Sequence, residues 1–350
     1  PLVSISQAVR ENGPRMPFLS TFVHDLLQIV TVALGSPLGR EVAPRELGAI
    51  FATQLSERAG LGPEYKRIMI ACGAGAGLAA VYNVPLGGAL FTLEVLLQSF
   101  EFSAVIPAIA TSAIATGVAW LGLGNTPQYR LPPLVLSHSL VVWSILIGPV
   151  FGLAAYVFVQ ATRAARAHAP KDWHLPALCA VVFPAIGLLA IFFPQLLGNG
   201  KSIAQAGFEN DIALHLAAAL LLLRFIIILG ALRAGAAGGL LTPGMSLGGL
   251  LGIVLGSFWH YGAPSAPLAA FAIVGSAGFL ASSMKMPLTA IVLILEFTRI
   301  GHDFLIPISF AVAGSYSVFH LCMQRNAGRK PSSAAVAEIE PGMLTSEVVH

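Results

Sequence analysis

Long hydrophobic stretches recur along this chain, and each is long enough to cross a lipid bilayer as a helix. They cover residues 17–35, 68–97, 102–123, 140–165, 175–198, 212–232, 240–260, 268–297 and 304–323, within a few residues at each end. The sequence is 56% hydrophobic and only 10% charged, whereas a soluble domain carries about 25% charged residues. Because a water-soluble protein of this size could not hide so much apolar surface, we expect an all-α polytopic membrane protein.

Most of these stretches are interrupted by proline, glycine and polar residues. The interruptions include Ser36-Pro37, Asn83-Val84-Pro85, Thr242-Pro243 and Lys285-Met286-Pro287. A broken helix at membrane depth is tolerated only inside protein or beside a water-filled cavity. The pattern is therefore typical of transporters and channels and unlike that of a simple membrane anchor.

The chain contains an internal repeat. Residues 70–95 align without a gap with residues 272–297, so that Pro85-Leu86 meets Pro287-Leu288 and Leu93-Glu94 meets Leu295-Glu296. Weak internal symmetry is typical of secondary-transporter folds, whose substrate site lies between the repeats. We assign residues 1–330 to one transmembrane domain, with repeats at about 1–125 and 140–330, and residues 331–350 to a polar tail.

A polar turn, Gly39-Arg40-Glu41-Val42-Ala43-Pro44, breaks the first part of the chain. Pro37 disfavours helix at Ser36, and Pro44 suits the first turn of a new helix. The backbone N–H groups of about residues 40–43 then lack intrahelical acceptors and form a ready anion site. Glu41 could occupy this site and leave it on protonation, as a gate does, or could merely cap the helix.

A second turn of this kind runs from Gly235 to Thr242-Pro243 and includes Gly239, Leu240 and Leu241. It lies at nearly the repeat spacing from the first turn, so the starts of two helices could point at one site. The alternative is a purely structural hinge. Glycines 244, 248, 252 and 256 follow, and their spacing predicts a face for close helix packing.

Other polar residues within apolar sequence have competing interpretations. Glu94 and Glu296 are functional candidates because of their membrane depth, but their equivalent repeat positions equally favour a shared structural role. For Asp25, Arg224 and Lys285 we expect structural pairing.

An enzyme is the remote alternative. Gly244-Met245-Ser246-Leu247-Gly248 matches the nucleophile elbow of serine hydrolases, and His215, His260 or His320 could serve as the partner. That motif requires a strand–turn–helix setting, which a glycine-rich helix does not provide. We therefore expect no enzymatic activity.

Charge and cysteine content restrict the partners further. The net charge of +3 favours no nucleic-acid partner, and Cys72, Cys179 and Cys322 stand alone without zinc-binding or disulfide spacing. We expect no cofactor and no metal. The start at Pro1 carries no initiator methionine, and we expect upstream helices to be missing from this chain.

In its ordered motifs the chain resembles the CLC family of chloride channels and proton-coupled chloride antiporters, of the bacterial type without cytoplasmic regulatory domains. Gly39 to Ala43 is similar to the family's G-R/K-E-G-P signature, and Gly239 to Pro243 to its G-x-F-x-P signature. Further similar segments are Gly73 to Glu94 with Tyr82-Asn83-Val84-Pro85-Leu86, Gly198-Asn199-Gly200, Met286-Pro287-Leu288-Thr289, and Ile294-Leu295-Glu296. Order and spacing agree along nearly the whole chain.

The resemblance implies two inverted repeats and a homodimer in a bacterial inner membrane, with one pathway per subunit for chloride or other small anions, and in some members for protons. Glu41 falls at the family's gating glutamate. The anion would be held mainly by backbone N–H groups, at residues Gly39, Arg40, Glu41, Val42, Gly239, Leu240 and Leu241.

Several positions depart from the family pattern. Val42-Ala43 replaces Gly-Pro, and Leu241 replaces the usual phenylalanine, so the anion preference is open. The family's serine ligand would precede Pro1, and Ser333 stands where the pathway tyrosine is expected. Val95 occupies the place of the internal proton-relay glutamate and cannot accept a proton. We therefore predict a passive chloride channel gated by Glu41, with a proton-coupled chloride antiporter as the alternative.

Overall fold

The computed structural model describes residues 2–10, 13–262 and 266–327, and within these ranges the chain is helical without a β-strand. This confirms the expected all-α class. In chain order the helices are α1 (Ile5–Ala8), α2 (Phe18–Ala33), α3 (Val42–Arg58), α4 (Pro63–Tyr82), α5 (Pro85–Phe91), the π-helical turn η1 (Thr92–Leu97), α6 (Phe102–Leu123), α7 (His138–Ala167), α8 (His174–Phe192), the 3-10 turn η2 (Pro194–Leu196), α9 (Lys201–Phe208), α10 (Leu214–Arg233), α11 (Leu241–Gly262), α12 (Leu268–Ser283), α13 (Pro287–Thr298), the 3-10 turn η3 (His302–Phe304) and α14 (Leu305–Ala327).

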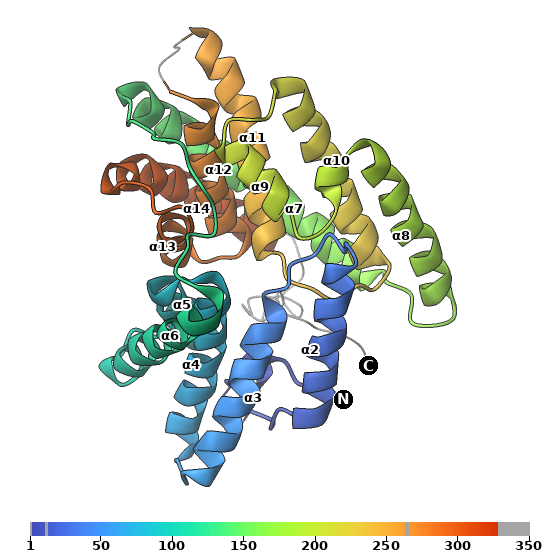
Figure 1. The fold of residues 1–350 in the computed structure, drawn as a ribbon, viewed down its shortest axis with the longest axis vertical. Helices are drawn as coiled ribbons and strands as arrows, with labels where there is room; N and C mark the ends of the chain where they lie inside the picture. The colour runs from blue at the N-terminus through green and yellow to red at the C-terminus, as the bar shows by residue number, and fades with distance from the viewer. Residues whose placement is uncertain (1, 11–12, 263–265, 328–350) are drawn as a thin grey trace.

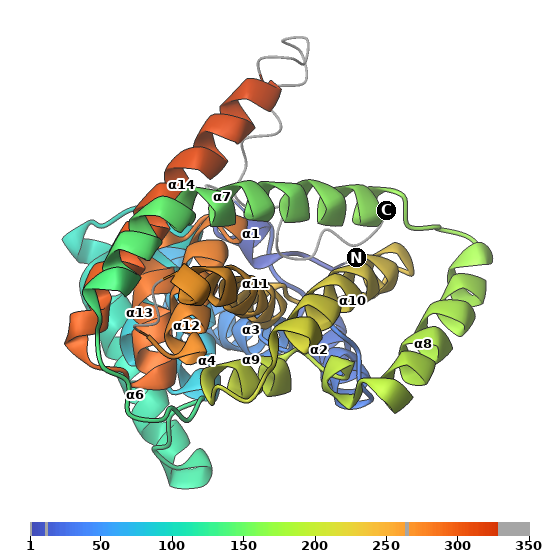
Figure 2. The same ribbon diagram turned by 90° about the horizontal axis from the view of Figure 1, so that it is seen from above.

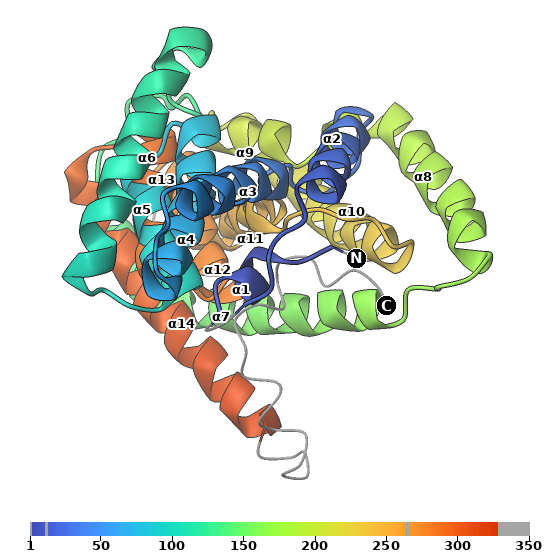
Figure 3. The same ribbon diagram turned by 90° about the horizontal axis from the view of Figure 1, so that it is seen from below.

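Within the residues that the structure describes, six helices are long and apolar enough to cross a membrane, namely α6, α7, α8, α10, α11 and α14 with its preceding turn. The chain is therefore a multi-pass membrane protein. In the views from above and from below, α3 and α11 lie near the middle of the molecule, while α6 and α8 lie at opposite edges (Figure 2 and Figure 3). Helix α3 was absent from the predicted hydrophobic stretches because it carries charged residues, two of which, Arg45 and Glu46, are buried.

The predicted stretches 68–97 and 268–297 are each broken once, at equivalent places of the repeat. Asn83 ends α4 and Lys285 follows α12, and both residues adopt left-handed backbone with φ of 57° and 54°. Pro85 and Pro287 then occupy the first positions of α5 and α13, where the missing N–H costs no hydrogen bond. The proline positions in the sequence predicted both breaks.

The two copies differ in length by one residue in the segments that follow Pro85 and Pro287. From Pro85 to the left-handed Gln98 the first copy is one residue longer than the second copy from Pro287 to the left-handed Arg299. A π-helical turn takes up the extra residue, as such bulges commonly do. Glu94 and Val95 both lie in this turn.

Glu94 and Glu296 tie the two repeats together. Glu296 accepts hydrogen bonds from two backbone N–H groups in the first turn of α5, at 3.0 and 2.7 Å. Glu94 accepts two such bonds in the first turn of α13, also at 3.0 and 2.7 Å. Helices α5 and α13 lie side by side (Figure 1). Each carboxylate thus caps the broken helix of the other repeat, which favours the shared structural role.

Each repeat also contains a close crossing of two helices at a pair of glycines. Gly48 of α3 meets Gly73 of α4, and Gly248 of α11 meets Gly275 of α12. A Cβ atom on any of the four would overlap or press upon backbone of the facing helix, so only glycine lets the helices approach this closely. The predicted packing role of the glycines that follow Pro243 is confirmed for Gly248, Gly252 and Gly256, which face α12.

Candidate functional site

Two turns that are distant in sequence meet just before α3 and α11. The Gly39 N–H donates to the Gly239 carbonyl at 2.8 Å, and the Gly239 N–H donates to the Gly39 carbonyl at 3.0 Å. This isolated antiparallel bridge brings the starts of α3 and α11 together near the middle of the molecule (Figure 1). The expectation that both helix N-termini converge on one place is met by this geometry.

The Glu41 side chain lies in a niche between the two turns and is fully buried. Its Oε1 atom accepts a hydrogen bond from the Leu241 N–H at 2.8 Å. A Cβ atom on either Gly39 or Gly239 would overlap this carboxylate. Both positions therefore need glycine if the carboxylate is to reach the start of α11.

Glu41 is the residue that precedes α3, but its carboxylate makes no capping hydrogen bond to that helix. The carboxylate instead binds a backbone donor of α11, two hundred residues away in the sequence. Of the two interpretations left open by the sequence, a group that occupies the converging helix N-termini fits this geometry. The alternative, in which Glu41 merely caps its own helix α3, does not fit this geometry.

The second carboxylate oxygen of Glu41 faces the Tyr82 hydroxyl, which the sequence analysis did not single out. Tyr82 donates to Oε2 at 3.4 Å and lies 3.2 Å from the Thr242 hydroxyl. Its ring packs edge-on against Phe297 with centroids 5.4 Å apart. Tyr82 is thus the side-chain donor that helps to hold Glu41 in the niche. Only its position beside the Asn83-Val84-Pro85 break could have drawn attention to it.

Replacing Tyr82 with phenylalanine should loosen this hold without disturbing the ring packing. Removing one hydrogen bond to a charged group costs about 1.5–3 kcal/mol, and the length of 3.4 Å places this bond at the weak end. For the anion transport that the family resemblance implies, we expect flux to rise at a given pH, because a less firmly held Glu41 would leave the niche more readily. Flux into proteoliposomes measures this effect. The matched variant Thr242→Val removes the other hydroxyl beside Tyr82 and leaves the Tyr82 hydroxyl in place to donate to Glu41. An unchanged flux in Tyr82→Phe would show that the hydroxyl does not hold Glu41.

The other predicted anion-binding residues take different places. Val42, Leu240 and Leu241 are buried at the starts of α3 and α11, whereas Arg40 is exposed. The N–H groups of Gly39 and Gly239 are both engaged in the bridge. These two glycines therefore shape the niche and do not offer donors to an anion, which corrects that part of the sequence prediction. Ser333 lies outside the described residues.

Arg224 supports the turn that leads into the site. Its guanidinium is fully buried and donates to the carbonyl oxygens of Leu196 at 2.9 Å, Gly198 at 2.8 Å and Pro37 at 3.0 Å. These three bonds fix the Gly198-Asn199-Gly200 turn against the segment before Gly39. The role is structural, as expected, although its partners are carbonyls and not a carboxylate.

The serine-hydrolase alternative has no structural support. Ser246 is fully buried inside α11, where its hydroxyl donates to the Pro243 carbonyl at 2.8 Å. A nucleophile elbow needs an exposed serine on a strand-to-helix turn. Within the described part of the chain, no group of three or more His, Cys, Asp or Glu side chains could hold a metal ion.

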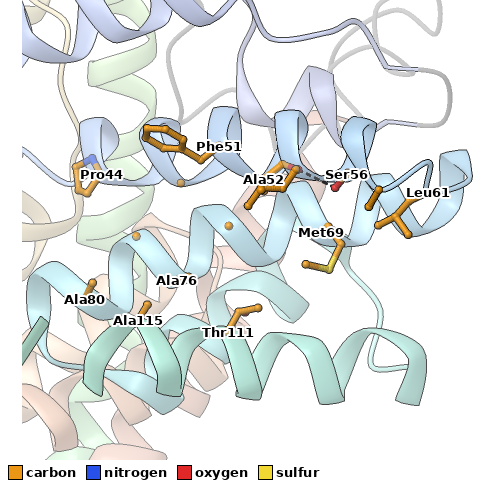
Figure 4. Close-up of a pocket in the computed structure, with 15 residues that line it drawn as sticks. Pro44, Phe51, Ala52, Ser56, Leu61, Met69, Ala76, Ala80, Thr111 and Ala115 are labelled. Carbon is orange, nitrogen blue, oxygen red and sulfur yellow. Dashed lines mark hydrogen bonds between the residues drawn. The ribbon is translucent and has the colours of Figure 1, made fainter. Parts of the chain in front are cut away.

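An apolar groove of about 490 Å³ lies beside the site, between α3, α4 and α6. Figure 4 shows its lining, which includes Pro44, Phe51 and Ala76. The lining carries no charged side chain and excludes Glu41 and Leu241. Its hydroxyls, those of Ser56 and Thr111, already donate to backbone carbonyls of their own helices, so we do not assign the groove to the anion path.

The family model described as voltage-gated chloride channel matches residues 2–320 of the chain. The chain belongs to the voltage-gated chloride channel family, CLC. A curated member from Citrobacter koseri, named voltage-gated ClC-type chloride channel ClcB, is 28% identical over 301 residues, which are 83% of this chain and 71% of that protein. The suspected family is thereby confirmed, and with it anion transport as the general function.

Two solved CLC structures share the fold. The slow cyanobacterial Cl⁻/H⁺ antiporter superposes with a TM-score of 0.82 at 20% identity, over 94% of this chain and 81% of that one. A CLC-type fluoride/proton antiporter superposes with a TM-score of 0.75 at 23% identity, over 89% and 78% of the two chains. At these identities the likeness establishes the CLC arrangement of helices.

Proposed function

We propose that this chain forms the anion pathway of a proton-coupled chloride antiporter, in which Glu41 couples the two ions. The observation that carries the proposal is the Glu41 carboxylate bound to the Leu241 N–H at 2.8 Å. A helix N-terminus favours an anion through its free N–H groups and its dipole. Glu41 and a transported chloride would therefore compete for the same donors.

Competition of this kind links the two ions. A charged carboxylate makes the stronger, charge-assisted hydrogen bond to the α11 backbone. A proton on Glu41 removes the charge, weakens that bond and lets the side chain leave the niche. Chloride then takes the vacated donors, and its departure allows Glu41 to return and release the proton. This coupling is reciprocal: if chloride binding favours the protonated form of Glu41, then protonation of Glu41 increases the affinity for chloride.

Passive conduction, which the sequence analysis ranked first, becomes the second candidate. It is supported by Val95, whose side chain lies in η1 and offers no proton acceptor, and by the channel name of the relative from Citrobacter koseri. Antiport is supported by the buried, competing position of Glu41 and by the two antiporters that share the fold. These observations favour coupling over free conduction.

The test is ion flux through the complete protein reconstituted in proteoliposomes. When chloride flows into the vesicles down its gradient, protons should move outward and acidify the weakly buffered external medium. Comparison of chloride, nitrate and fluoride would define the anion preference. Chloride flux without any proton movement would refute antiport and leave the channel interpretation.

A further inference from the structure

A positive charge is buried one helical turn after the Glu41 carboxylate. Arg45, near the start of α3, is only 1% exposed. The central carbon of its guanidinium lies over the Phe91 ring, 4.9 Å from the ring centroid. A cation–π contact of this kind offsets part of the cost of burying the cation, but a neutral ring supplies no opposite charge.

Within the part of the chain that the structure describes, no carboxylate forms an ion pair with Arg45. The Nε and Nη2 atoms of its guanidinium are buried and have no hydrogen-bond partner. A buried charge is costly unless it is paired, and arginine stays protonated in proteins. The surroundings of this guanidinium therefore favour a negative charge nearby.

Glu41 carries the negative charge that shares a helix face with Arg45. Its backbone is already close to helical, with φ of −69° and ψ of −14°, so the Cβ atoms of residues 41 and 45 lie about 5–6 Å apart. Helical side chains lean toward the N-terminus, which directs Arg45 toward Glu41. The two charges interact electrostatically, although the Glu41 carboxylate forms its hydrogen bonds with Leu241 and Tyr82.

The other titratable or charged groups around this pair lie outside the niche. Glu46 follows Arg45 directly, and adjacent residues of a helix project about 100° apart and do not face each other. Further such groups come from the turn before α3, from α2, from the end of α4 and from the segment before α7, namely Arg40, His24, Asp25, Tyr82 and Tyr129. Only the Glu41 carboxylate occupies the place that a transported anion would enter.

We propose that the buried charge of Arg45 favours a single negative charge in the niche, supplied in turn by Glu41 and by a chloride ion. The space for the ion is the space that the carboxylate fills beside the Leu241 N–H. When a protonated Glu41 leaves, the guanidinium lacks an opposite charge until chloride enters. When chloride leaves, the guanidinium favours transfer of the Glu41 proton to water and return of the carboxylate.

This inference rests on the proposed antiport and assigns part of the linkage between its two ions to Arg45. The N–H donors at the start of α11 attract Glu41 and chloride alike. Arg45 adds a cost to the two unwanted states, in which the niche holds no negative charge or two charges crowd one cation. It is thus a positioning residue, which acts through its charge on whichever anion the niche holds.

Chloride binding to the complete protein in detergent tests this assignment. Isothermal titration calorimetry compares the wild type with Arg45→Met from acidic to alkaline pH. At acidic pH, where Glu41 is protonated, the variant should bind chloride about tenfold or more weakly, because a unit charge beside the ion is removed. At alkaline pH chloride must displace ionised Glu41, which loses the same attraction, so the affinity should change little.

Three further variants complete the comparison. Arg45→Lys keeps the charge and should retain most of the affinity at acidic pH. Arg58→Met makes the matched change at an exposed position in the last turn of α3 and should bind chloride as the wild type does. Arg45→Met should fold, since replacing buried ionic groups with apolar ones is often neutral or stabilising. If it does not, Arg45→Gln gives the same comparison with a neutral polar side chain.

Two outcomes would overturn the inference. Unchanged chloride affinity at acidic pH would show that the Arg45 charge does not act on the niche. An equal loss at every pH would show that Arg45 only maintains the shape of the site. Failure of antiport has a separate signature, because the wild type would then move no protons in proteoliposomes, while the chloride affinities would still decide the role of Arg45.

Discussion

Glu41→Gln should abolish proton movement and leave a chloride flux that no longer responds to pH. The amide has nearly the shape of the carboxyl but carries no titratable proton and no charge, so it permanently mimics the protonated gate. In the wild type, chloride flux should rise as pH falls, because protonation neutralises the carboxylate that occupies the Leu241 N–H. In the variant, flux at neutral pH should match the wild-type flux at acidic pH.

Proton flux in this variant should fall by about a hundredfold or more, since a positioned proton-transfer group has been removed. Glu41→Ala should behave in the same way, with the niche emptied. Glu64→Gln makes the same chemical change at an exposed position in the first turn of α4 and serves as the control. The measurement is chloride efflux recorded together with external pH from acidic to neutral conditions. A variant with the wild-type pH response would reduce Glu41 to a structural residue.

Gly48→Leu and Gly275→Leu should each prevent stable folding. At both positions a side chain would run into the backbone of the facing helix, at the crossings of α3 with α4 and of α11 with α12. Overpacking of a core typically costs about 1–3 kcal/mol. The obstacle here is backbone that cannot change rotamer, so we expect a cost at or above the upper end of that range.

Gly117→Leu is the matched control for these substitutions. Gly117 lies in α6, and a Cβ atom there meets nothing within 4 Å. Because leucine favours helix over glycine by up to about 1 kcal/mol, this variant should be as stable as the wild type or more stable. Thermal unfolding of detergent-purified protein, with the yield of monodisperse material, measures all three. Equal melting temperatures for Gly48→Leu and the control would contradict the close crossing.

The sequence alone determined the class of the fold and the places where its helices break. Pro85 and Pro287 lack a backbone N–H and cannot continue a helix, so the breaks at Asn83 and Lys285 follow from local covalent structure. The length and apolar composition of the stretches determined that they cross a membrane. The starts of α3 and α11 were likewise predictable, since the unpaired N–H groups of a helix start are a local property.

Only the tertiary structure decided which groups meet. Glu41 could cap its own helix or reach another, and the Gly39–Gly239 bridge brings the Leu241 N–H to its carboxylate. The tertiary structure likewise decided that Glu94 and Glu296 each cap a helix of the other repeat, and that Tyr82 contacts Glu41. The physical reason is that a carboxylate in a low-dielectric interior binds whichever donor the helix crossings bring near, and those crossings are set by packing between segments far apart in the chain.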